Sequence, residues 1–219
     1  MDAIYVGVDV AGARNTWVAG LAEGEEGLEV VWAPQLRSLE AIVAYCQEAP
    51  VVAVAIDGHL TMSLTAETGF RASDRQLRAL LPRGCRNWVS SLNSLMAVPV
   101  RGQLLAEHLS PLVGTVLETH PRASLLFALG EGAEGAARAY KGGGEAGARA
   151  IAALWKGWAA RFGISVDEAP RTDGALDALV CATTAYVYHR DPGALLQLQE
   201  EDSVRGWGPF YVMGKVDDA

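Results

Sequence analysis

The stretch that most constrains the fold is a short apolar run near the N-terminus that ends in a single carboxylate. It reads Ile4-Tyr5-Val6-Gly7-Val8-Asp9-Val10-Ala11-Gly12. A continuous apolar run of this length predicts a β-strand from Tyr5 to Val10 that is buried on both faces. Asp9 would then lie in the interior, where an unpaired carboxylate costs on the order of several kcal/mol. We therefore expect Asp9 to have charged partners or a bound cation.

Two later apolar runs also end in a carboxylate, Val51–Asp57 and Leu112–Glu118. A helix predicted from Ser38 to Cys46 makes the run at 51–57 a crossover strand, which lies parallel to the first strand and beside it. Asp9 and Asp57 should therefore emerge together at the carboxyl end of the sheet. Ligands of open α/β sheets bind at that end.

A carboxylate pair begins a helix near the C-terminus. Thr172 is a suitable N-cap for a helix from Asp173 to about His189. Asp173 and Asp177 are four residues apart and so share one face of this helix. Carboxylates gathered at one end of a sheet raise each other's pKa, and a divalent cation relieves that conflict. Because no Cys or His cluster is present, the expected ion is Mg²⁺ or Mn²⁺.

These carboxylates form one set of candidate catalytic residues: Asp9, Asp57, Glu118, Asp173 and Asp177. Three of them are the expected metal ligands: Asp9, Asp57 and Asp177. Each carboxylate alone also has a structural interpretation. A strand-end Asp often caps the next loop, an Asp in a first helical turn complements the helix dipole, and Glu118 can pair with Arg122.

The segment from about 58 to 111 is less regular and rich in arginine, which we interpret as a helical insertion. Arginine side chains suit phosphate, although a solvated helix face explains them equally well. The glycine-rich segment from about 130 to 147 predicts a mobile loop. The candidate substrate-binding residues are Arg71, Arg75, Arg78, His59, His120 and Lys141.

Composition limits the class of protein. The chain of 219 residues has a formal net charge of -8 and three widely spaced cysteines. The charge gives no overall basic footprint for nucleic acid, and the cysteines fit reduced cytoplasmic thiols. We find no signal peptide and no apolar stretch long enough to cross a membrane, which takes about 20 residues. We expect a single cytoplasmic domain over residues 1–219, with a homo-oligomer left open.

The ordered motifs resemble a family of proteins of unknown function that are regarded as predicted nucleases with a ribonuclease H-like fold. The motifs are Gly7-Val8-Asp9-Val10-Ala11-Gly12, Ala55-Ile56-Asp57, Phe70-Arg71-Ala72-Ser73-Asp74-Arg75-Gln76-Leu77-Arg78, Glu118-Thr119-His120-Pro121 and Asp173-Gly174-Ala175-Leu176-Asp177-Ala178. Where the family often has Ala-Pro after its second aspartate, this chain has Gly58-His59-Leu60. The resemblance spans about Tyr5 to Tyr188.

The resemblance implies an α/β fold with a mixed five-stranded sheet in the order 3-2-1-4-5, flanked by helices. It also implies a two-metal site on Asp9, Asp57 and the last helix, in which the helical pair is similar to that of Holliday-junction resolvases. The leading hypothesis is therefore a metal-dependent nuclease that acts on short or structured nucleic acid. The alternatives are a small phosphotransferase or ATPase related to sugar kinases and a non-catalytic nucleic-acid binding module.

Overall fold

The computed structural model describes residues 2–63, 67–95, 97–165, 168–199 and 204–215. Its strands are β1 (Ile4–Asp9), β2 (Trp17–Gly24), β3 (Gly27–Leu36), β4 (Val51–Asp57), β5 (Thr61–Ser63), β6 (Thr115–Thr119), β7 (Ile164–Ser165), β8 (Leu195–Leu198), β9 (Val204–Gly206) and β10 (Phe210–Met213). Its α-helices are α1 (Leu39–Glu48), α2 (Ala72–Leu80), α3 (Val98–Leu109), α4 (Pro121–Leu129), α5 (Glu134–Ala139), α6 (Gly144–Phe162) and α7 (Asp173–Arg190). Short 3-10 helices are η1 (Arg83–Trp88), η2 (Leu92–Ser94), η3 (Glu131–Ala133) and η4 (Pro192–Ala194).

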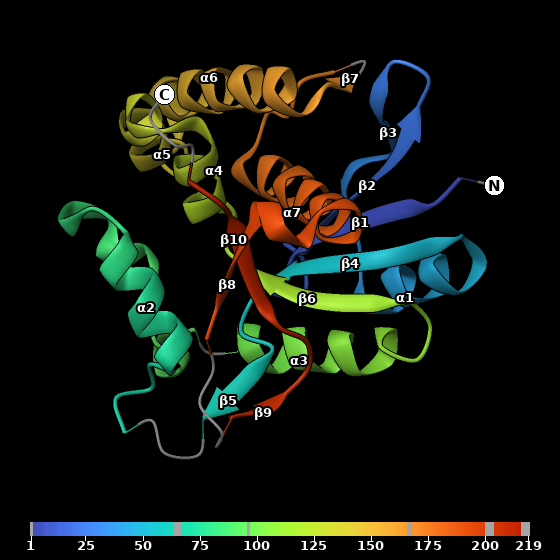
Figure 1. The fold of residues 1–219 in the computed structure, drawn as a ribbon, viewed down its shortest axis with the longest axis horizontal. Helices are drawn as coiled ribbons and strands as arrows, with labels where there is room; N and C mark the ends of the chain where they lie inside the picture. Colours follow the sequence, from blue (N-terminus) through green and yellow to red (C-terminus); the bar gives the residue numbers. More distant parts are fainter. Residues whose placement is uncertain (1, 64–66, 96, 166–167, 200–203, 216–219) are drawn as a thin grey trace.

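The main sheet has the order β7-β3-β2-β1-β4-β6-β10-β8 (Figure 1). Strands β1, β2 and β3 form an antiparallel meander, and β4 and β6 follow in parallel with β1. The five central strands thus have the predicted order 3-2-1-4-5, and the ribonuclease H-like fold class is confirmed. The sheet has more strands than expected, because β7 is added at one edge and β10 and β8 are added at the other.

Helices cover both faces of the central strands. In Figure 1, α7 lies across one face, and α1 and α3 lie on the other. Successive side chains of a strand point to opposite faces. In β1, Val6 and Val8 pack with residues of α1 and α3, whereas Tyr5 packs with residues of α7. By the same alternation Asp9 lies on the face that α7 covers.

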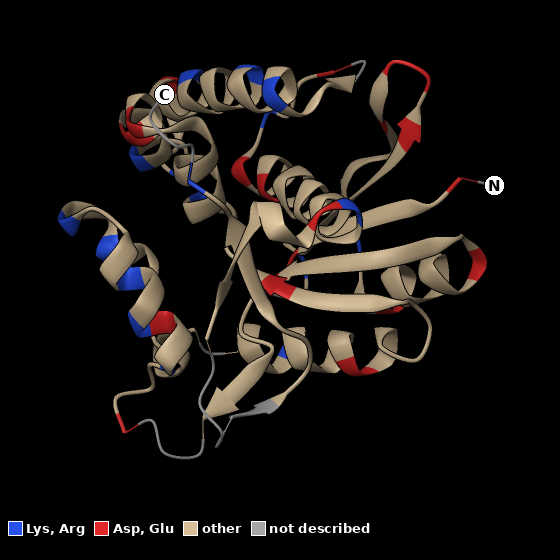
Figure 2. Cartoon of the chain, in the orientation of Figure 1, with Lys and Arg blue, Asp and Glu red and all other residues tan. Residues whose placement is uncertain are grey.

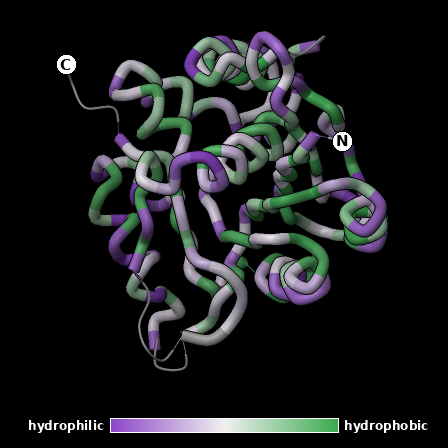
Figure 3. Tube along the Cα trace, turned by 45° about the vertical axis from the view of Figure 1, so that its right-hand side comes forward, coloured by the Kyte–Doolittle hydropathy of each residue, from purple (hydrophilic) through white to green (hydrophobic). Residues whose placement is uncertain are grey.

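Several helices have a hydrophobic and a hydrophilic side, which Figure 3 shows as green and purple along their coils, whereas α7 and α4 are buried over most of their surface. The apolar sides of α1 and α3 supply Ile42, Cys46, Leu105 and Leu109 to the core on their face of the sheet. Within the described residues, no helix combines the length and apolar character needed to span a bilayer.

A glycine in β1 brings α7 close to the strand. A Cβ atom at Gly7 would lie 2.1 Å from the carbonyl oxygen of Ala178 and 2.1 Å from the backbone nitrogen of Ala182. Only a residue without a side chain allows this approach. The close approach also holds Asp177, the residue before Ala178, close to β1.

We expect Gly7→Ala to destabilise the fold by about 1–3 kcal/mol or more, because the new methyl group meets helix backbone rather than a flexible side chain. The matched control is Gly12→Ala, since a Cβ there has no described atom within 4 Å. Urea unfolding of both variants measures the difference. Equal stability of the two variants would show that α7 does not pack this closely on β1.

Two segments differ from the predictions. The segment 130–147, expected as a loop, contains η3, α5 and the start of α6. Its alanine content favours helix more strongly than its glycines oppose it. Within the insertion, the sequence also predicts a helix from Leu92 to Leu109, and the structure begins this helix only at Val98, after the 3-10 turn η2.

Candidate active site

Three aspartates meet at the carboxyl ends of β1 and β4. Asp9 and Asp57 are paired in register as the last residues of these parallel neighbours. Asp177 comes from the second turn of α7, whose first turn is capped by the Thr172 hydroxyl accepting from the Ala175 N–H. One carboxylate oxygen of each aspartate lies within 4.8 Å of the others. The sequence predicted this group of three as metal ligands.

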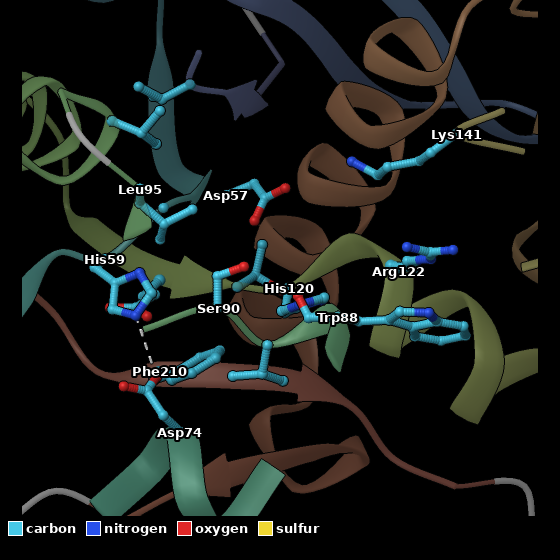
Figure 4. A pocket seen from close by; sticks show the side chains of 16 residues that line it. Asp57, His59, Asp74, Trp88, Ser90, Leu95, His120, Arg122, Lys141 and Phe210 are labelled. Carbon is cyan, nitrogen blue, oxygen red and sulfur yellow. Dashed lines mark hydrogen bonds and ion pairs between the residues drawn. The ribbon is translucent and has the colours of Figure 1, made fainter. Parts of the chain in front are cut away.

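A lysine and a tyrosine hold Asp177 in place. The Tyr140 hydroxyl donates to Asp177 Oδ1 at 2.8 Å, and Lys141 Nζ lies 2.7 Å from Oδ2. The Lys141 side chain is 37% exposed, but its amine points inward toward α7 and Asp57 (Figure 4). Both residues follow α5, so the glycine-rich segment places the Lys141 ammonium group beside the carboxylates.

Burial and neighbouring negative charges raise the pKa values of these carboxylates. Burial, followed by the charges of Asp177 and Asp57, raises the pKa of Asp9 well above its ordinary value. Burial raises the pKa of Asp57 to about 6, although the Lys141 charge opposes the rise. The pKa of Asp177 is raised in the same way. Burial alone would lower the pKa of Lys141, but the three aspartates outweigh it and raise that pKa.

Asp173 lies outside the group of three. It occupies the first turn of α7 and is partly exposed, and its charge contributes to the raised pKa of Asp9. Its catalytic role remains a prediction.

Glu118 does not join the aspartates, and the reason is the register of β6. Thr119, not Glu118, pairs with Asp57, and Glu118 pairs with Ile56. Ile56 packs on the α1 and α3 side of the sheet. Since neighbouring strands in register point the same way, Glu118 faces away from α7. Glu118 therefore lies on the opposite face of the sheet from the three aspartates.

Glu118 instead anchors a buried ion-pair network. Arg71 binds it through two hydrogen bonds, of 2.6 Å to Oε1 and 2.8 Å to Oε2, and the Leu60 N–H donates to Oε2 at 2.8 Å. Arg71 also binds both carboxylate oxygens of Asp74, and His59 Nε2 lies 3.4 Å from Asp74 Oδ1 (Figure 4). Arg71 is 1% exposed. Its expected role as a phosphate ligand is therefore wrong, as is the pairing of Glu118 with Arg122.

The other two arginines of α2 have different surroundings. Arg75 is exposed and donates to the Phe70 carbonyl at 2.7 Å. Arg78 donates to the carbonyls of Arg86 and Val89, each at 3.0 Å, and so shapes the chain after η1. Figure 2 shows basic residues recurring along α2. Phosphate binding by Arg75 remains a prediction, whereas Arg78 mainly supports the loop.

His120 is the N-cap of α4. Its Nδ1 accepts from the Ala123 N–H at 3.2 Å, and its Nε2 lies 3.3 Å from the Trp88 carbonyl. Burial lowers the pKa of His120 to about 4, and the nearby Lys141 charge adds to this. The imidazole is therefore neutral near pH 7, with both nitrogens engaged. It lines the site as a structural cap rather than as a cationic phosphate ligand.

The lowered pKa of His120 predicts a pH dependence of stability. The unfolded chain, with an ordinary His pKa of about 6.5, binds a proton before the folded chain does. Stability should therefore fall as pH drops from about 6.5 to 4, by up to about 1.4 kcal/mol per pH unit from this group. His120→Asn keeps a capping oxygen and should remove that contribution. Urea unfolding across this range checks it, with exposed His108→Asn as the control expected to retain the wild-type slope.

A cavity of about 240 Å³ opens beside the aspartates, at the carboxyl ends of β1, β4 and β6. Asp57 and Lys141 belong both to its lining and to the carboxylate site. Its other polar lining residues include His59, Ser90 and Thr119, and its apolar ones include Val10, Trp88, Leu95 and Phe210. The insertion thus supplies much of one wall (Figure 4). A group bound here would lie next to Asp57.

Comparison of the sequence with models of protein families gives no match, and comparison with curated proteins gives none either. Two solved structures of Thermus thermophilus RuvC, one in complex with a Holliday junction substrate, are similar in shape. Each has 16% sequence identity and aligns over 85% of this chain, covering 94% and 95% of the RuvC chains with TM-scores of 0.45 and 0.42. At these scores the fold assignment rests on the strand order and directions given above, and membership of the predicted-nuclease family remains a prediction.

Three residues of the site were not predicted from sequence. Tyr140 was placed in the glycine-rich loop without a role, although its position next to Lys141 is a signal that the pair acts together. Thr119 aligns with Asp57 because β6 continues one residue beyond Glu118. Trp88 reaches the cavity from η1, where it stacks with the Arg122 guanidinium 4.1 Å from the ring centre. No spacing in the sequence indicates that contact.

Proposed function

We propose that this chain is a metal-dependent nuclease that hydrolyses phosphodiester bonds. The observation that carries the proposal is the meeting of Asp9, Asp57 and Asp177, whose oxygens lie within 4.8 Å of one another. Carboxylates that are crowded, largely buried and raised in pKa suit a hard divalent cation such as Mg²⁺ or Mn²⁺. The donor set therefore fits the group that this chemistry requires.

The formal charges of the side chains at the site indicate how many divalent cations the site can hold. The three ionised aspartates and the Lys141 ammonium carry a net charge of -2, which one divalent cation balances. With Asp173 included and Lys141 withdrawn, the charge would be -4, which two ions balance. We infer that one ion is held while Lys141 lies against Asp177. The predicted two-metal form would require Lys141 to move to the substrate.

A bound divalent ion supplies Lewis-acid stabilisation for the charge that develops on a phosphate under attack. Asp9, Asp57 and Asp177 hold it, and Tyr140 fixes the orientation of Asp177. The Lys141 ammonium is placed to bind a non-bridging phosphate oxygen. His59 lines the cavity beside Asp57 and is available there as a substrate contact. The net charge of -8 favours short or structured nucleic acid over long tracts.

The test is an assay of the purified chain with Mg²⁺ or Mn²⁺ against single-stranded, duplex and branched DNA and RNA, with ATP in parallel. We expect cleavage of at least one polynucleotide that stops when the metal is chelated. ATP turnover without any strand cleavage would favour the phosphotransferase alternative. No turnover of any substrate, together with no thermal shift on metal addition, would favour the binding module.

Lys141→Met should have opposite effects on metal binding and on catalysis. Removing one positive charge next to the carboxylates should tighten Mn²⁺ binding by at least about tenfold, since unit charges about 4 Å apart interact by roughly 4 kcal/mol near a protein surface. Strand cleavage should fall at the same time. Calorimetric titration of Mn²⁺ measures the first effect. The control is Lys156→Met on the exposed side of α6, which should bind Mn²⁺ as the wild type does.

A further inference from the structure

The cavity beside the carboxylates carries polar atoms that have no hydrogen-bond partner among the described residues. Thr119 is 2% exposed, and its Oγ1 is buried without a partner. His59 is 7% exposed, and its buried Nε2 makes only the long 3.4 Å contact with Asp74. Buried polar atoms are nearly always hydrogen-bonded in folded proteins. Two such atoms in the lining of one cavity point to a bound polar group.

The apolar part of the cavity wall is largely fixed. Trp88 is held by Arg122, and Phe210 lies against the Arg71 guanidinium, 5.6 Å from its ring centre. The other apolar side chains of the lining are those of Val10, Val89, Leu95 and Val98. At about 240 Å³ the cavity is smaller than the roughly 300–1,000 Å³ of sites for drug-sized ligands. It suits one flat ring system with polar edges rather than a base pair or a stack.

We infer that the cavity binds a single unstacked nucleobase whose own phosphate lies at the carboxylate site. This inference rests on the proposed function. Asp57 and Lys141 line the cavity and also belong to the carboxylate site, so one nucleotide reaches both. Flipped bases are bound in this manner, by apolar or aromatic walls and by hydrogen bonds to their edges. The preferred substrate then has an unpaired nucleotide next to the cut bond.

The test compares ligands with and without a base. Calorimetry with Mn²⁺ present should show adenosine 5′- or 3′-monophosphate binding at least about tenfold more tightly than ribose 5-phosphate. Ser90→Phe, which fills the cavity, should abolish this difference, whereas the exposed neighbour Asn87→Phe should retain it. Thr119→Val changes no volume and should weaken nucleotide binding about threefold or more while leaving ribose 5-phosphate unchanged.

Two results would overturn the inference, and they are distinguishable. If ribose 5-phosphate and both nucleotides bind equally to the wild type, the cavity binds no base, while a metal and phosphate site remains supported. If none of the three ligands binds with Mn²⁺ present, the proposed function fails together with the inference. Retention of the nucleotide preference in a folded Ser90→Phe variant, checked by its melting temperature, would also contradict it.

Discussion

Asp9→Asn should lower metal-dependent strand cleavage by at least about a thousandfold and should make the metal-free protein more stable. The activity should fall because the substitution removes one carboxylate of the proposed metal site, at the point where β1, β4 and α7 meet. The stability rises because the folded chain no longer crowds three carboxylates. Burial and the charges of Asp177 and Asp57 raise the pKa of Asp9, so the ionised form is disfavoured in the folded state. Relief of such strain at a functional site is typically worth about 0.5–2 kcal/mol.

The two effects are measured on the same preparation, by initial cleavage rates with Mn²⁺ and by urea unfolding in chelator near pH 8. Metal should stabilise the wild type and leave Asp9→Asn nearly unchanged, since a ligand stabilises a fold only as far as it binds. The control is Asp2→Asn, which makes the same change at an exposed position before β1. Wild-type cleavage by Asp9→Asn would show that this aspartate holds no ion needed for the reaction.

Arg71→Met should destabilise the protein by about 3–5 kcal/mol, the largest loss of stability that we expect from a single substitution. The variant leaves Glu118 and Asp74 buried, at 2% and 1% exposure, without the guanidinium that binds them. Removal of one partner from a buried ion pair has a cost in this range. Burial raises the pKa of Asp74, but Arg71 and the nearby His59 outweigh burial and lower that pKa, so its charge persists in the fold.

Urea unfolding of Arg71→Met and of Arg83→Met separates the buried from the exposed arginine. Arg83 lies in η1 and is exposed, so its substitution should change stability by no more than about 0.5 kcal/mol. If Arg71 were a phosphate ligand, Arg71→Met would instead weaken substrate binding without loss of stability. That outcome would contradict the network described above.

The sequence was sufficient to predict the sheet order and the three aspartates of the site. Continuous apolar runs ending in Asp9 and Asp57 indicate buried parallel strands, and the carboxyl ends of such strands meet at one edge. Asp177 was predicted because it follows Asp173 by four residues and so shares one face of the same helix. The meeting of Asp9 and Asp57 depends only on local pattern and on the direction of strands, whereas the full order 3-2-1-4-5 came from the family resemblance.

The role of Glu118 could not be predicted, because it depends on a one-residue difference in where β6 ends. A shift of one residue moves a side chain to the other face of a sheet. Glu118 ends its apolar run as Asp57 does, but the strand continues through Thr119, which takes the position beside Asp57. Nothing in the spacing of charges indicates that continuation.

Contacts distant in sequence account for the other differences. Arg71 appeared to belong to a basic helix face, but Glu118, 47 residues later, neutralises it in the interior. Lys141 was predicted to bind phosphate from a mobile loop, and the structure places its ammonium on Asp177 instead, 36 residues away in sequence. Its role with substrate remains a prediction. Pairings of this kind require the three-dimensional arrangement of the sheet and α7.

The most direct test of the central claim is a crystal structure of the wild-type chain soaked in Mn²⁺, with the anomalous signal used to locate the ion. We predict a peak whose ligands include oxygens of Asp9, Asp57 and Asp177, at oxygen–metal distances of about 2.0–2.3 Å. A crystal in which Mn²⁺ occupies no position between these three carboxylates, or contacts only one of them, would contradict the claim that they form a shared metal site.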